Sequence, residues 1–449
     1  MLLPALILTT SLQTITLTPP STIKEGEVNE FSLSEVPKPE NPFDPKVASL
    51  EAVITDPSGR TITLPGYWDQ VMTRSLESGK EVIKPTPKEG WKLRWAPLVP
   101  GRHRIEVTLT QPGLKVKMNT QAQVIKNETP GFIRIHPKNP RYFSDSKGRT
   151  FFPIGPNVCW GNDKGTFNYD EWLVQYAKVG INYGRLWLSP QWTTFGLESK
   201  ETGWGKVNLG NAWRLDYVLK LAQEKGIHLM LCFESFNVLQ AGQQYSGWTD
   251  SVYNKANGGP LANPAEFWDS PEANRVFTNK MRYLVARYGA YRSVFAWEFW
   301  NEVDLVNSFN AQKAARWHDR MATSLAALDP YDHLISTSAA TTPGIPAVDK
   351  VAGIQFVQSH HYSSPDIAVT VAETEMAKRA QFPTKPHYFG EIGADWAGPR
   401  TDDDPEGYQI HDTMWASIAA GSSGAASTWW WDNLIAPKNL YGLYTPVFK

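Results

Sequence analysis

The sequence has 449 residues, of which 41% are hydrophobic and 20% are charged, and this composition excludes a disordered chain. Lys and Arg total 44 against 45 for Asp and Glu, so the net charge of −1 offers no basic excess to attract nucleic acid or an anionic membrane. The length predicts two or three domains, or one barrel with a smaller module.

The chain is rich in aromatic residues and poor in cysteine. Its 19 Trp, 17 Tyr and 19 Phe indicate either a large core or flat ring surfaces that bind the faces of sugars. Only two cysteines are present, Cys159 and Cys232, which excludes a disulfide scaffold. Both fall at the ends of predicted strands that are not neighbours, so we expect free, half-buried thiols.

The first 13 residues are apolar and begin Met-Leu-Leu-Pro-Ala-Leu-Ile-Leu. They resemble the remnant of a signal peptide, although a basic start and a clear cleavage site are missing. This favours a secreted or periplasmic bacterial protein. No run in the sequence reaches the roughly 20 apolar residues that span a bilayer, so a membrane helix is not expected.

Residues 14–128 are predicted to form an all-β domain. Alternating runs such as Leu50-Glu-Ala-Val-Ile-Thr and His103-Arg-Ile-Glu-Val-Thr are separated by turn sequences such as Asp56-Pro-Ser-Gly. This spacing is typical of a β-sandwich. After a link near Asn127-Glu-Thr-Pro-Gly, the second domain is expected to span residues 129–449.

A hairpin is predicted at the start of the second domain. The sequence Arg141-Tyr-Phe-Ser-Asp-Ser-Lys-Gly-Arg-Thr-Phe-Phe has a strong turn at its centre, Asp145-Ser-Lys-Gly. We expect this hairpin to lead directly into the first strand of the domain.

From about residue 151, strand-like apolar runs alternate with amphipathic stretches, the pattern of a parallel sheet with helices outside it. Eight strands of this kind predict the fold class α/β, a (β/α)8 TIM barrel with an N-terminal all-β sandwich. The expected strands are Phe151–Asn157, Ile181–Leu188, His228–Phe233, Val294–Asn301, His333–Ser338, Gly353–His360, His387–Glu391 and Ala425–Trp430.

Several helices are marked at their ends. One is expected from about Ala212 to Lys225 before Gly226, one from Pro271, and one from about Gln312 to Leu328. The Pro- and Gly-rich connection at 339–351 is too short for a clear helix. About nineteen residues follow Trp430, enough to begin an eighth helix but not to finish one.

Two glutamates stand at predicted strand ends, where functional residues of such barrels lie. Glu302 follows Asn301 at the end of the fourth strand, and Glu391 ends the seventh, whereas Glu298 lies earlier and is placed in the barrel wall. A buried carboxylate in an apolar strand is energetically costly unless it is paired with a cation. A single glutamate at one of these positions could therefore be interpreted as a structural ion-pair partner. Facing each other across the barrel mouth, the two match the pair about 5–5.5 Å apart that retaining glycosidases use.

The order and placement of these motifs resemble glycoside hydrolase clan A, and most closely family 5, the cellulase and β-mannanase family. The matching residues extend over about 300 residues, from the first strand to the eighth. The resemblance implies that Glu302, after Asn301, is the acid/base and that Glu391 is the nucleophile. Residues 14–128 resemble the immunoglobulin-like module that often precedes such barrels.

Other strand ends match the same family. Arg185, in Asn182-Tyr-Gly-Arg-Leu-Trp, matches the second-strand arginine of the clan and is expected to keep the nucleophile ionised, because a nearby cation lowers a carboxyl pKa. The sixth strand ends with His360-His-Tyr362. Tyr362 is expected to donate its hydroxyl to Glu391, and His360 to bridge toward Glu302. His361 remains the alternative to His360.

Candidate substrate contacts lie at the remaining strand ends. Asn301 is expected to bind the sugar 2-hydroxyl beside the reacting carbon. Trp429 or Trp430, with preference for Trp430, is expected to form the floor under the reacting sugar. Asn157 and Trp160, after the first strand, are candidates for a further subsite.

Two long connections are candidates for the walls of the cleft, Ser189–Asn211 and Phe236–Ser270. They weakly favour attack at chain ends over cleavage within the chain. Glu234 and Asn237, after the third strand, are weaker candidates for contacts in the same place.

No metal and no cofactor is expected. His360 and His361 are neighbours on a strand and point to opposite faces, and no His-x-His ends the first strand as metal-dependent barrel hydrolases require. The expected partner is a carbohydrate, and the oligomeric state stays open.

These residues predict a retaining hydrolase of β-glycosidic bonds that acts by double displacement. Glu302, more desolvated, is expected to start protonated, and Glu391 to be ionised at neutral pH. A β-mannan or β-glucan is the favoured substrate, and β-galactan stays open. The alternative is a catalytically silent carbohydrate-binding protein on the same barrel.

Overall fold

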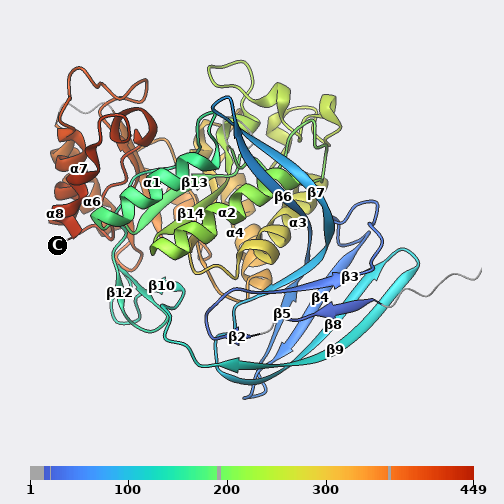
Figure 1. The fold of residues 1–449 in the computed structure, drawn as a ribbon. Helices are drawn as coiled ribbons and strands as arrows, with labels where there is room; N and C mark the ends of the chain where they lie inside the picture. The colour runs from blue at the N-terminus through green and yellow to red at the C-terminus, as the bar shows by residue number, and fades with distance from the viewer. Residues whose placement is uncertain (1–14, 21, 190–193, 363–365, 449) are drawn as a thin grey trace, which may run out of the picture.

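The computed structural model describes residues 15–20, 22–189, 194–362 and 366–448. Residues 1–13, the predicted signal-peptide remnant, lie outside the described residues. The chain forms an N-terminal region of mainly antiparallel sheets, strands β1 to β9 and here called the β region, and an α/β region that follows the connecting hairpin (Figure 1).

The β region contains two sheets that share one core. Alternate residues of each strand are buried, for example Phe31 and Leu33 in one sheet and Leu50 and Ala52 in the other. The four-stranded sheet has the order β1 (Thr16–Thr18), β3 (Asn29–Ser34), β7 (Lys80–Trp95), β6 (Tyr67–Glu77). The five-stranded sheet has the order β2 (Ile23–Lys24), β9 (Leu114–Ile125), β8 (Gly101–Gln111), β4 (Ser49–Thr55), β5 (Thr61–Pro65). The strands of this region therefore agree with the predicted all-β stretch.

A small sheet connects the two regions. It pairs β10 (Ile133–Ile135), β11 (Phe143–Asp145) and β12 (Thr150–Phe151) antiparallel, which confirms the hairpin at Asp145. Phe143 and Phe151 pack in one cluster with Phe295 and Tyr388, two residues near the starts of parallel strands. The hairpin thus closes the end of the strands opposite to the one where Glu302 and Glu391 lie.

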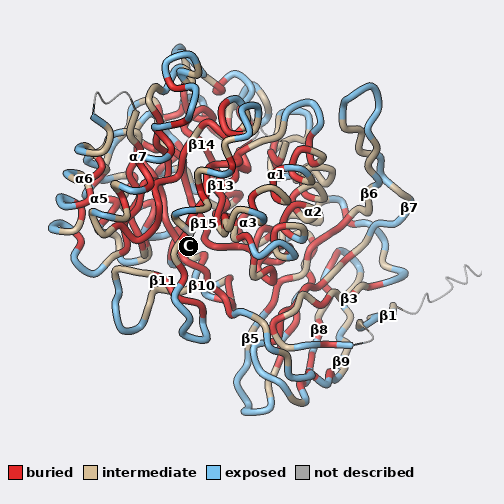
Figure 2. The backbone as a smooth tube through the Cα atoms, turned by 60° about the vertical axis from the view of Figure 1, so that its left-hand side comes forward, coloured by how far each residue is buried: buried red, intermediate tan, exposed pale blue. Residues whose placement is uncertain are grey.

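The α/β region is built on parallel strands. One sheet has the order β13 (Tyr183–Trp187), β14 (His228–Ser235), β15 (Val294–Asn301), β16 (Leu334–Ser336), and a second pairs β17 (Val357–Tyr362) with β18 (His387–Gly393). The prediction of a mixed α/β fold with parallel strands is therefore confirmed, and Figure 2 shows the buried residues concentrated along these strands.

The first and eighth predicted strands are wrong in part. Phe151 belongs to the hairpin, and of the rest of the first stretch only Asn157 makes a bridge, parallel to Arg185. Pro153 and Pro156 lack the N–H groups that a strand would use, which explains the interruption. The eighth stretch likewise has one bridge, from Thr428 to Ile392.

Helices cover the outside of these strands (Figure 1). The predicted helices are confirmed, with Ser270 capping the N-terminus of α3 and Gly226 ending α2 in the left-handed conformation. The helices are α1 (Thr166–Val179), α2 (Leu209–Lys225), α3 (Pro271–Tyr288), α4 (Ala311–Leu328), α5 (Pro346–Asp349), α6 (Ile367–Gln381), α7 (Tyr408–Ala419) and α8 (Thr445–Phe448).

Short helical turns fill the loops, and residues 431–448 contain two of them together with the four-residue helix α8. The turns are η1 (Phe236–Leu239), η2 (Trp248–Asp250), η3 (Lys255–Asn257), η4 (Pro264–Glu266), η5 (Val303–Leu305), η6 (Trp431–Ile435) and η7 (Leu440–Tyr444). Among the described residues, no helix combines the length and apolarity that crossing a membrane requires.

The β region is attached to α2 and α3 through buried ion pairs. Arg94 on β7 donates to Asp216 on α2 at 2.5 Å, and Arg287 on α3 donates to the same carboxylate at 2.7 Å. Arg287 also reaches Asp69 on β6 at 2.7 Å, and Arg94 reaches Glu30 on β3 at 2.7 Å. We call these five residues the interface cluster.

Candidate active site

The structure brings Glu302 and Glu391 together at the carboxyl ends of the parallel strands. Glu302 follows β15 directly, and Glu391 lies on β18. Nδ1 of His360, on β17, is 3.0 Å from a carboxylate oxygen of Glu302 and 3.6 Å from one of Glu391. One such atom from each of the three residues lies within 4.8 Å of the others. The two carboxylates and the histidine therefore form one compact group.

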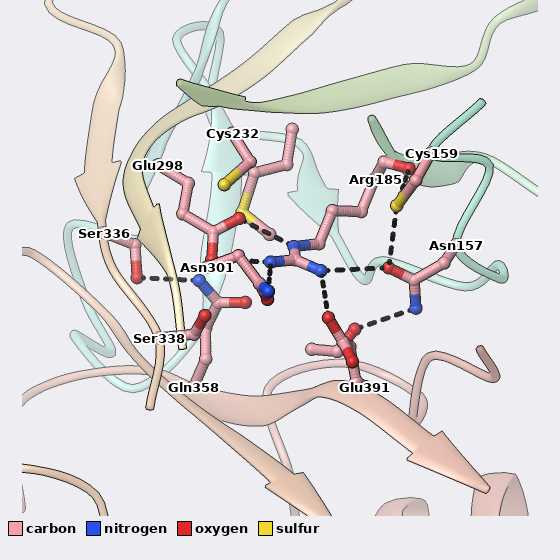
Figure 3. A network of polar contacts seen from close by, with 12 residues as sticks. Asn157, Cys159, Arg185, Cys232, Glu298, Asn301, Ser336, Ser338, Gln358 and Glu391 are labelled. Atoms are coloured by element: carbon pink, nitrogen blue, oxygen red, sulfur yellow. Dashed lines mark hydrogen bonds and ion pairs between the residues drawn. The ribbon is translucent and has the colours of Figure 1, made fainter. Parts of the chain in front are cut away.

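Arg185, on β13, lies against Glu391 (Figure 3). Its side chain is completely buried. It donates to Glu391 at 2.6 Å and, through two nitrogens, to both oxygens of Glu298 at 2.6 and 2.9 Å. Its remaining contacts are the side-chain oxygens of Asn301 at 2.9 Å and Asn157 at 3.3 Å. A forked pair of this kind fixes the plane of the guanidinium, so the position of Glu391 is fixed with it.

Glu298 is the partner that the sequence analysis did not find. Its place on a strand agrees with the prediction, and it is fully buried there and bonded to Arg185. An ionisable residue in the apolar strand Phe295-Ala-Trp-Glu-Phe-Trp was a signal, because a carboxylate buried there requires a cation.

The sixth predicted strand contributes as expected. The hydroxyl of Tyr362 donates to Glu391 at 2.7 Å. His360 faces the two glutamates, whereas Nδ1 of its neighbour His361 lies 2.9 Å from the hydroxyl of Thr342. Of the two histidines, His360 is therefore the one that contacts the carboxylates.

The two carboxyl groups both have raised pKa values. Burial, with a contribution from the charge of Asp304, raises the pKa of Glu302 to about 8. Burial also raises the pKa of Glu391, against the lowering effect of His360 and Arg185. The prediction of a protonated Glu302 agrees with its shift, and Arg185 lowers the pKa of Glu391 as expected, although burial outweighs that effect.

A cavity of about 910 Å³ opens above this group. Five tryptophans line part of it, and three of them touch: the ring centroids of Trp160 and Trp429 are 5.5 Å apart, and those of Trp187 and Trp429 are 5.2 Å apart. Trp430 lines the cavity too, and its indole N–H donates to the backbone oxygen of Asp395 at 3.2 Å. Both Trp429 and Trp430 thus face the candidate site, together with Trp160.

Three predicted substrate contacts do not line this cavity: Asn157, Asn301 and Arg185. Asn157 is fully buried, and its amide donates to the backbone oxygen of Gly390 at 3.0 Å. Asn301 is also buried, accepting from Arg185 and donating to the hydroxyl of Ser235 at 3.3 Å. The placement of Asn157 at a sugar subsite is therefore wrong, because its polar groups are used within the protein.

The two cysteines border the same network. Sγ of Cys159 lies 3.5 Å from the backbone oxygen of Arg185, and that of Cys232 lies 3.2 Å from that of Glu234. Both are free, as predicted, but they are fully rather than half buried.

Of the two long connections, the second lines the cavity. Phe236, Gln240, Gln243, Gln244 and Tyr245 come from Phe236–Ser270, whereas the described part of Ser189–Asn211 contributes no lining residue. Glu234 is buried and bonded to Lys280 and Tyr253 instead. The sequence analysis missed the cavity residues Leu305, Ala397 and 340–343, which lie in loops without a distinctive motif.

An α/β fold that joins two carboxylates, a buried arginine and a tryptophan-lined cavity resembles the glycoside hydrolases. No family model matches the chain. Its sequence is 26% identical over 203 residues to a protein named probable mannan endo-1,4-beta-mannosidase F of Aspergillus oryzae, covering 42% of this chain and 41% of the relative. It is also 26% identical over 212 residues to mannan endo-1,4-beta-mannosidase 4 of Oryza sativa, covering 44% and 43%.

Solved structures agree on the fold. A Bacteroides vulgatus protein named as a putative glycoside hydrolase has a TM-score of 0.64 at 16% identity. The match covers 91% of this chain and 71% of that one. The endo-1,4-beta-mannanase of Rhizomucor miehei has a TM-score of 0.53 at 17% identity, covering 71% and 99%. The chain spans about two fifths of the curated relatives it matches, and the predicted resemblance to a family 5-like glycoside hydrolase is confirmed.

Proposed function

We propose that this chain is a retaining glycoside hydrolase that cleaves β-glycosidic bonds in β-mannan. The observation that carries the proposal is the pairing of Glu302 with Glu391 beside His360, with oxygen and nitrogen atoms within 4.8 Å of one another. Retaining enzymes place their two carboxyl groups about 5–5.5 Å apart, whereas inverting enzymes leave about 6.5–9.5 Å for a water molecule. The short separation supports double displacement.

In the first step, a carboxylate oxygen of Glu391 attacks the anomeric carbon while Glu302 gives its proton to the departing glycosidic oxygen. In the second step, Glu302 takes a proton from water, whose oxygen displaces Glu391 from the same carbon and restores the original configuration. Two donors to Glu391, Arg185 and Tyr362, favour its ionised form, while burial of Glu302 favours the protonated form.

Two observations support β-mannan as the substrate. The relatives named above act on mannan by their names, and the tryptophans of the cavity offer apolar faces to sugar rings. β-Glucan is the second choice. We further propose that Trp429 and Trp430 form the floor under the reacting sugar, and that Arg185, Asn301 and Asn157 act as supports of Glu391 from below the cavity.

We also infer that the eight strand segments close into a (β/α)8 barrel. Three contacts outside the regular sheets support closure. The backbone N–H of Asn157 donates to Thr428 at 2.9 Å, Thr428 bridges to Ile392, and Gln355 donates to Ile335 at 2.9 Å between the two sheets. The barrel is assigned to residues 129–449 and an immunoglobulin-like sandwich to residues 14–128. A secreted or periplasmic location is proposed from residues 1–13 alone.

The test is product analysis with a nucleophile variant. We expect the wild-type chain to release manno-oligosaccharides from β-mannan, and Glu391→Ala to lose this activity by about 10⁴-fold or more. Azide added to Glu391→Ala should restore turnover of an activated aryl glycoside and yield the inverted glycosyl azide. Near-native activity of Glu391→Ala would overturn the assignment. Sugar binding by a wild-type chain that cleaves no polysaccharide of a mannan, glucan and galactan panel would favour the silent binding protein.

A further inference from the structure

We propose that the loop after β14 forms a separate sugar subsite, in which the ring of Tyr245 is the platform and the amides of Gln243 and Gln244 bind hydroxyl groups. The ligand is a sugar unit of the same neutral β-linked polymer, remote from the bond that is cleaved. The inference rests on the proposed function for the identity of that polymer.

Tyr245 lies at the cavity in an unusual backbone conformation. Its side chain lines the cavity and is 46% exposed, which is high for a large aromatic residue. Its φ angle is +66°, in the left-handed region that non-glycine residues avoid. Strained residues of this kind persist only where the surrounding structure fixes them, and they are concentrated at ligand sites.

The residue that fixes this conformation is Asn237. Asn237 is fully buried in η1, and its amide donates to the backbone oxygen of Tyr245 at 2.8 Å. Its own backbone oxygen accepts from the N–H of Gly247 at 2.9 Å, so the same asparagine holds the chain on both sides of Tyr245. Its side-chain oxygen accepts from the hydroxyl of Ser235 at 2.7 Å.

The same hydrogen bonds continue to the catalytic group. The amide of Asn301 donates to the hydroxyl of Ser235 at 3.3 Å, and Arg185 donates to Asn301 at 2.9 Å and to Glu391 at 2.6 Å. Tyr245 is therefore held by the network that positions Glu391, and the distance between the two is set by buried side chains rather than by a free loop.

The chemistry of the loop fits a neutral sugar. From Phe236 to Trp248 the sequence contains no Asp, Glu, Lys, Arg or His, so nothing in the loop attracts a charged ligand. Gln243 and Gln244 are exposed at the cavity, and an amide can both donate to and accept from sugar hydroxyl groups; the oxygen of Gln243 accepts from Gln240 at 3.0 Å, which leaves its N–H groups to donate. An aromatic ring beside amides is the combination by which proteins bind a pyranose face and its edge.

The test compares Tyr245→Ala with wild type on β-1,4-manno-oligosaccharides of two to six units. The wild-type kcat/KM should rise with chain length, and in Tyr245→Ala that rise should shrink by about 5- to 10-fold, the size of one lost aromatic contact. Tyr245→Phe should keep the rise because it keeps the ring. Tyr408→Ala is the matched control, since Tyr408 on α7 is 64% exposed and lies outside the cavity lining.

Two further measurements keep the outcomes distinct. Asn237→Ala should reproduce the loss of length dependence, which a merely structural role would not produce. An equal loss at every chain length, or no loss in Tyr245→Ala, would overturn the subsite. A wild-type chain that cleaves none of these oligosaccharides would refute the proposed function instead, and weaker binding of mannohexaose by Tyr245→Ala in calorimetry would then still support the subsite.

Discussion

Two buried arginines of this molecule are each paired with two carboxylates, but the pKa values of the carboxyl groups around them are shifted in opposite directions. Arg185 lies below the cavity between Glu298 and Glu391, and Arg287 lies in the interface cluster between Asp216 and Asp69. Neither guanidinium is more than 1% exposed. The two clusters therefore differ in their surroundings rather than in their pairing.

The pKa values show the difference. In the interface cluster burial raises the pKa of Asp69, but the charges of Arg287 and Lys92 outweigh it and the pKa is lowered. At the cavity burial prevails, and the pKa values of Glu302 and Glu391 are both raised. A carboxylate of lowered pKa, such as Asp69, stays charged and joins two regions, whereas the raised pKa of Glu302 suits a group that gives and takes a proton.

The largest expected effect concerns the acid of the cavity. Glu302→Gln keeps the shape of the side chain but removes its proton donor, so kcat on mannan should fall by about 10³- to 10⁴-fold. An aryl glycoside with a good leaving group should lose less in its first step, because its leaving oxygen needs no proton. Steady-state and burst kinetics on both substrates measure the difference. An equal loss on the two would contradict the acid role of Glu302.

The comparison predicts different results from the same substitution in the two clusters. Arg185→Lys loses the forked pair with Glu298 and weakens the hold on Glu391, so kcat should fall by about 10- to 100-fold, the range of one hydrogen bond to a charged group. Arg287→Lys should instead lower the free energy of unfolding and leave kcat unchanged. Lysine keeps the positive charge but has fewer donors, so the loss should be about 1.5–3 kcal/mol, the value of one hydrogen bond to a charged group. Urea unfolding and kcat should be measured on both variants. If Arg287→Lys lowered kcat as much as Arg185→Lys, the contrast between the two clusters would be wrong.

The pH profile tests the raised pKa of Glu302. Glu302 must be protonated to act as the acid, so kcat/KM should fall above pH 8 by about tenfold per pH unit. Glu391 must be ionised, so activity should also fall as the pH is lowered through its pKa, which burial places above 4.5. A basic limb near pH 5 would contradict this assignment.

The same shift has a consequence for stability. A carboxyl group with a raised pKa contributes stability that is fully present below pH 4.5 and is lost as the pH rises through 8. Glu302→Gln should therefore lose less stability than wild type between pH 5 and pH 9 in urea unfolding.

The sequence predicted the elements of the fold better than the contacts between them. Helices such as α3 carry local signals, since Ser270 and Pro271 mark a helix start. The hydrogen bonds lost at Pro153 and Pro156 were also readable, because proline has no N–H, but the strand was extended across both. Local sequence signals therefore predict where most helices and strands begin and end.

Side-chain contacts between residues far apart in the sequence could not be predicted from local signals, because they depend on tertiary packing. The positions of Glu302 and Glu391 followed from strand ends, but the pairing of Glu298 with Arg185 joins two strands 113 positions apart. Asn157 was expected to meet a sugar because it ends a predicted strand, and only the fold shows its amide bonded to Gly390. Tyr245 had no motif at all, since its role depends on a backbone angle that the sequence does not display.

The smallest expected effect separates two tyrosines that contact the two clusters. Tyr362 donates to Glu391 at 2.7 Å, and Tyr283 accepts from Arg287 at 2.8 Å. Tyr362→Phe removes a bond that lowers the pKa of Glu391, so that pKa should rise further and the acidic limb of kcat/KM should move to higher pH, with about tenfold lower kcat. Tyr283→Phe should shift the unfolding midpoint and leave the pH profile in place. A displaced acidic limb in Tyr283→Phe would mean that the interface cluster also controls the ionisation of the cavity carboxylates, although no residue of that cluster contributes to the pKa shifts of Glu302 or Glu391.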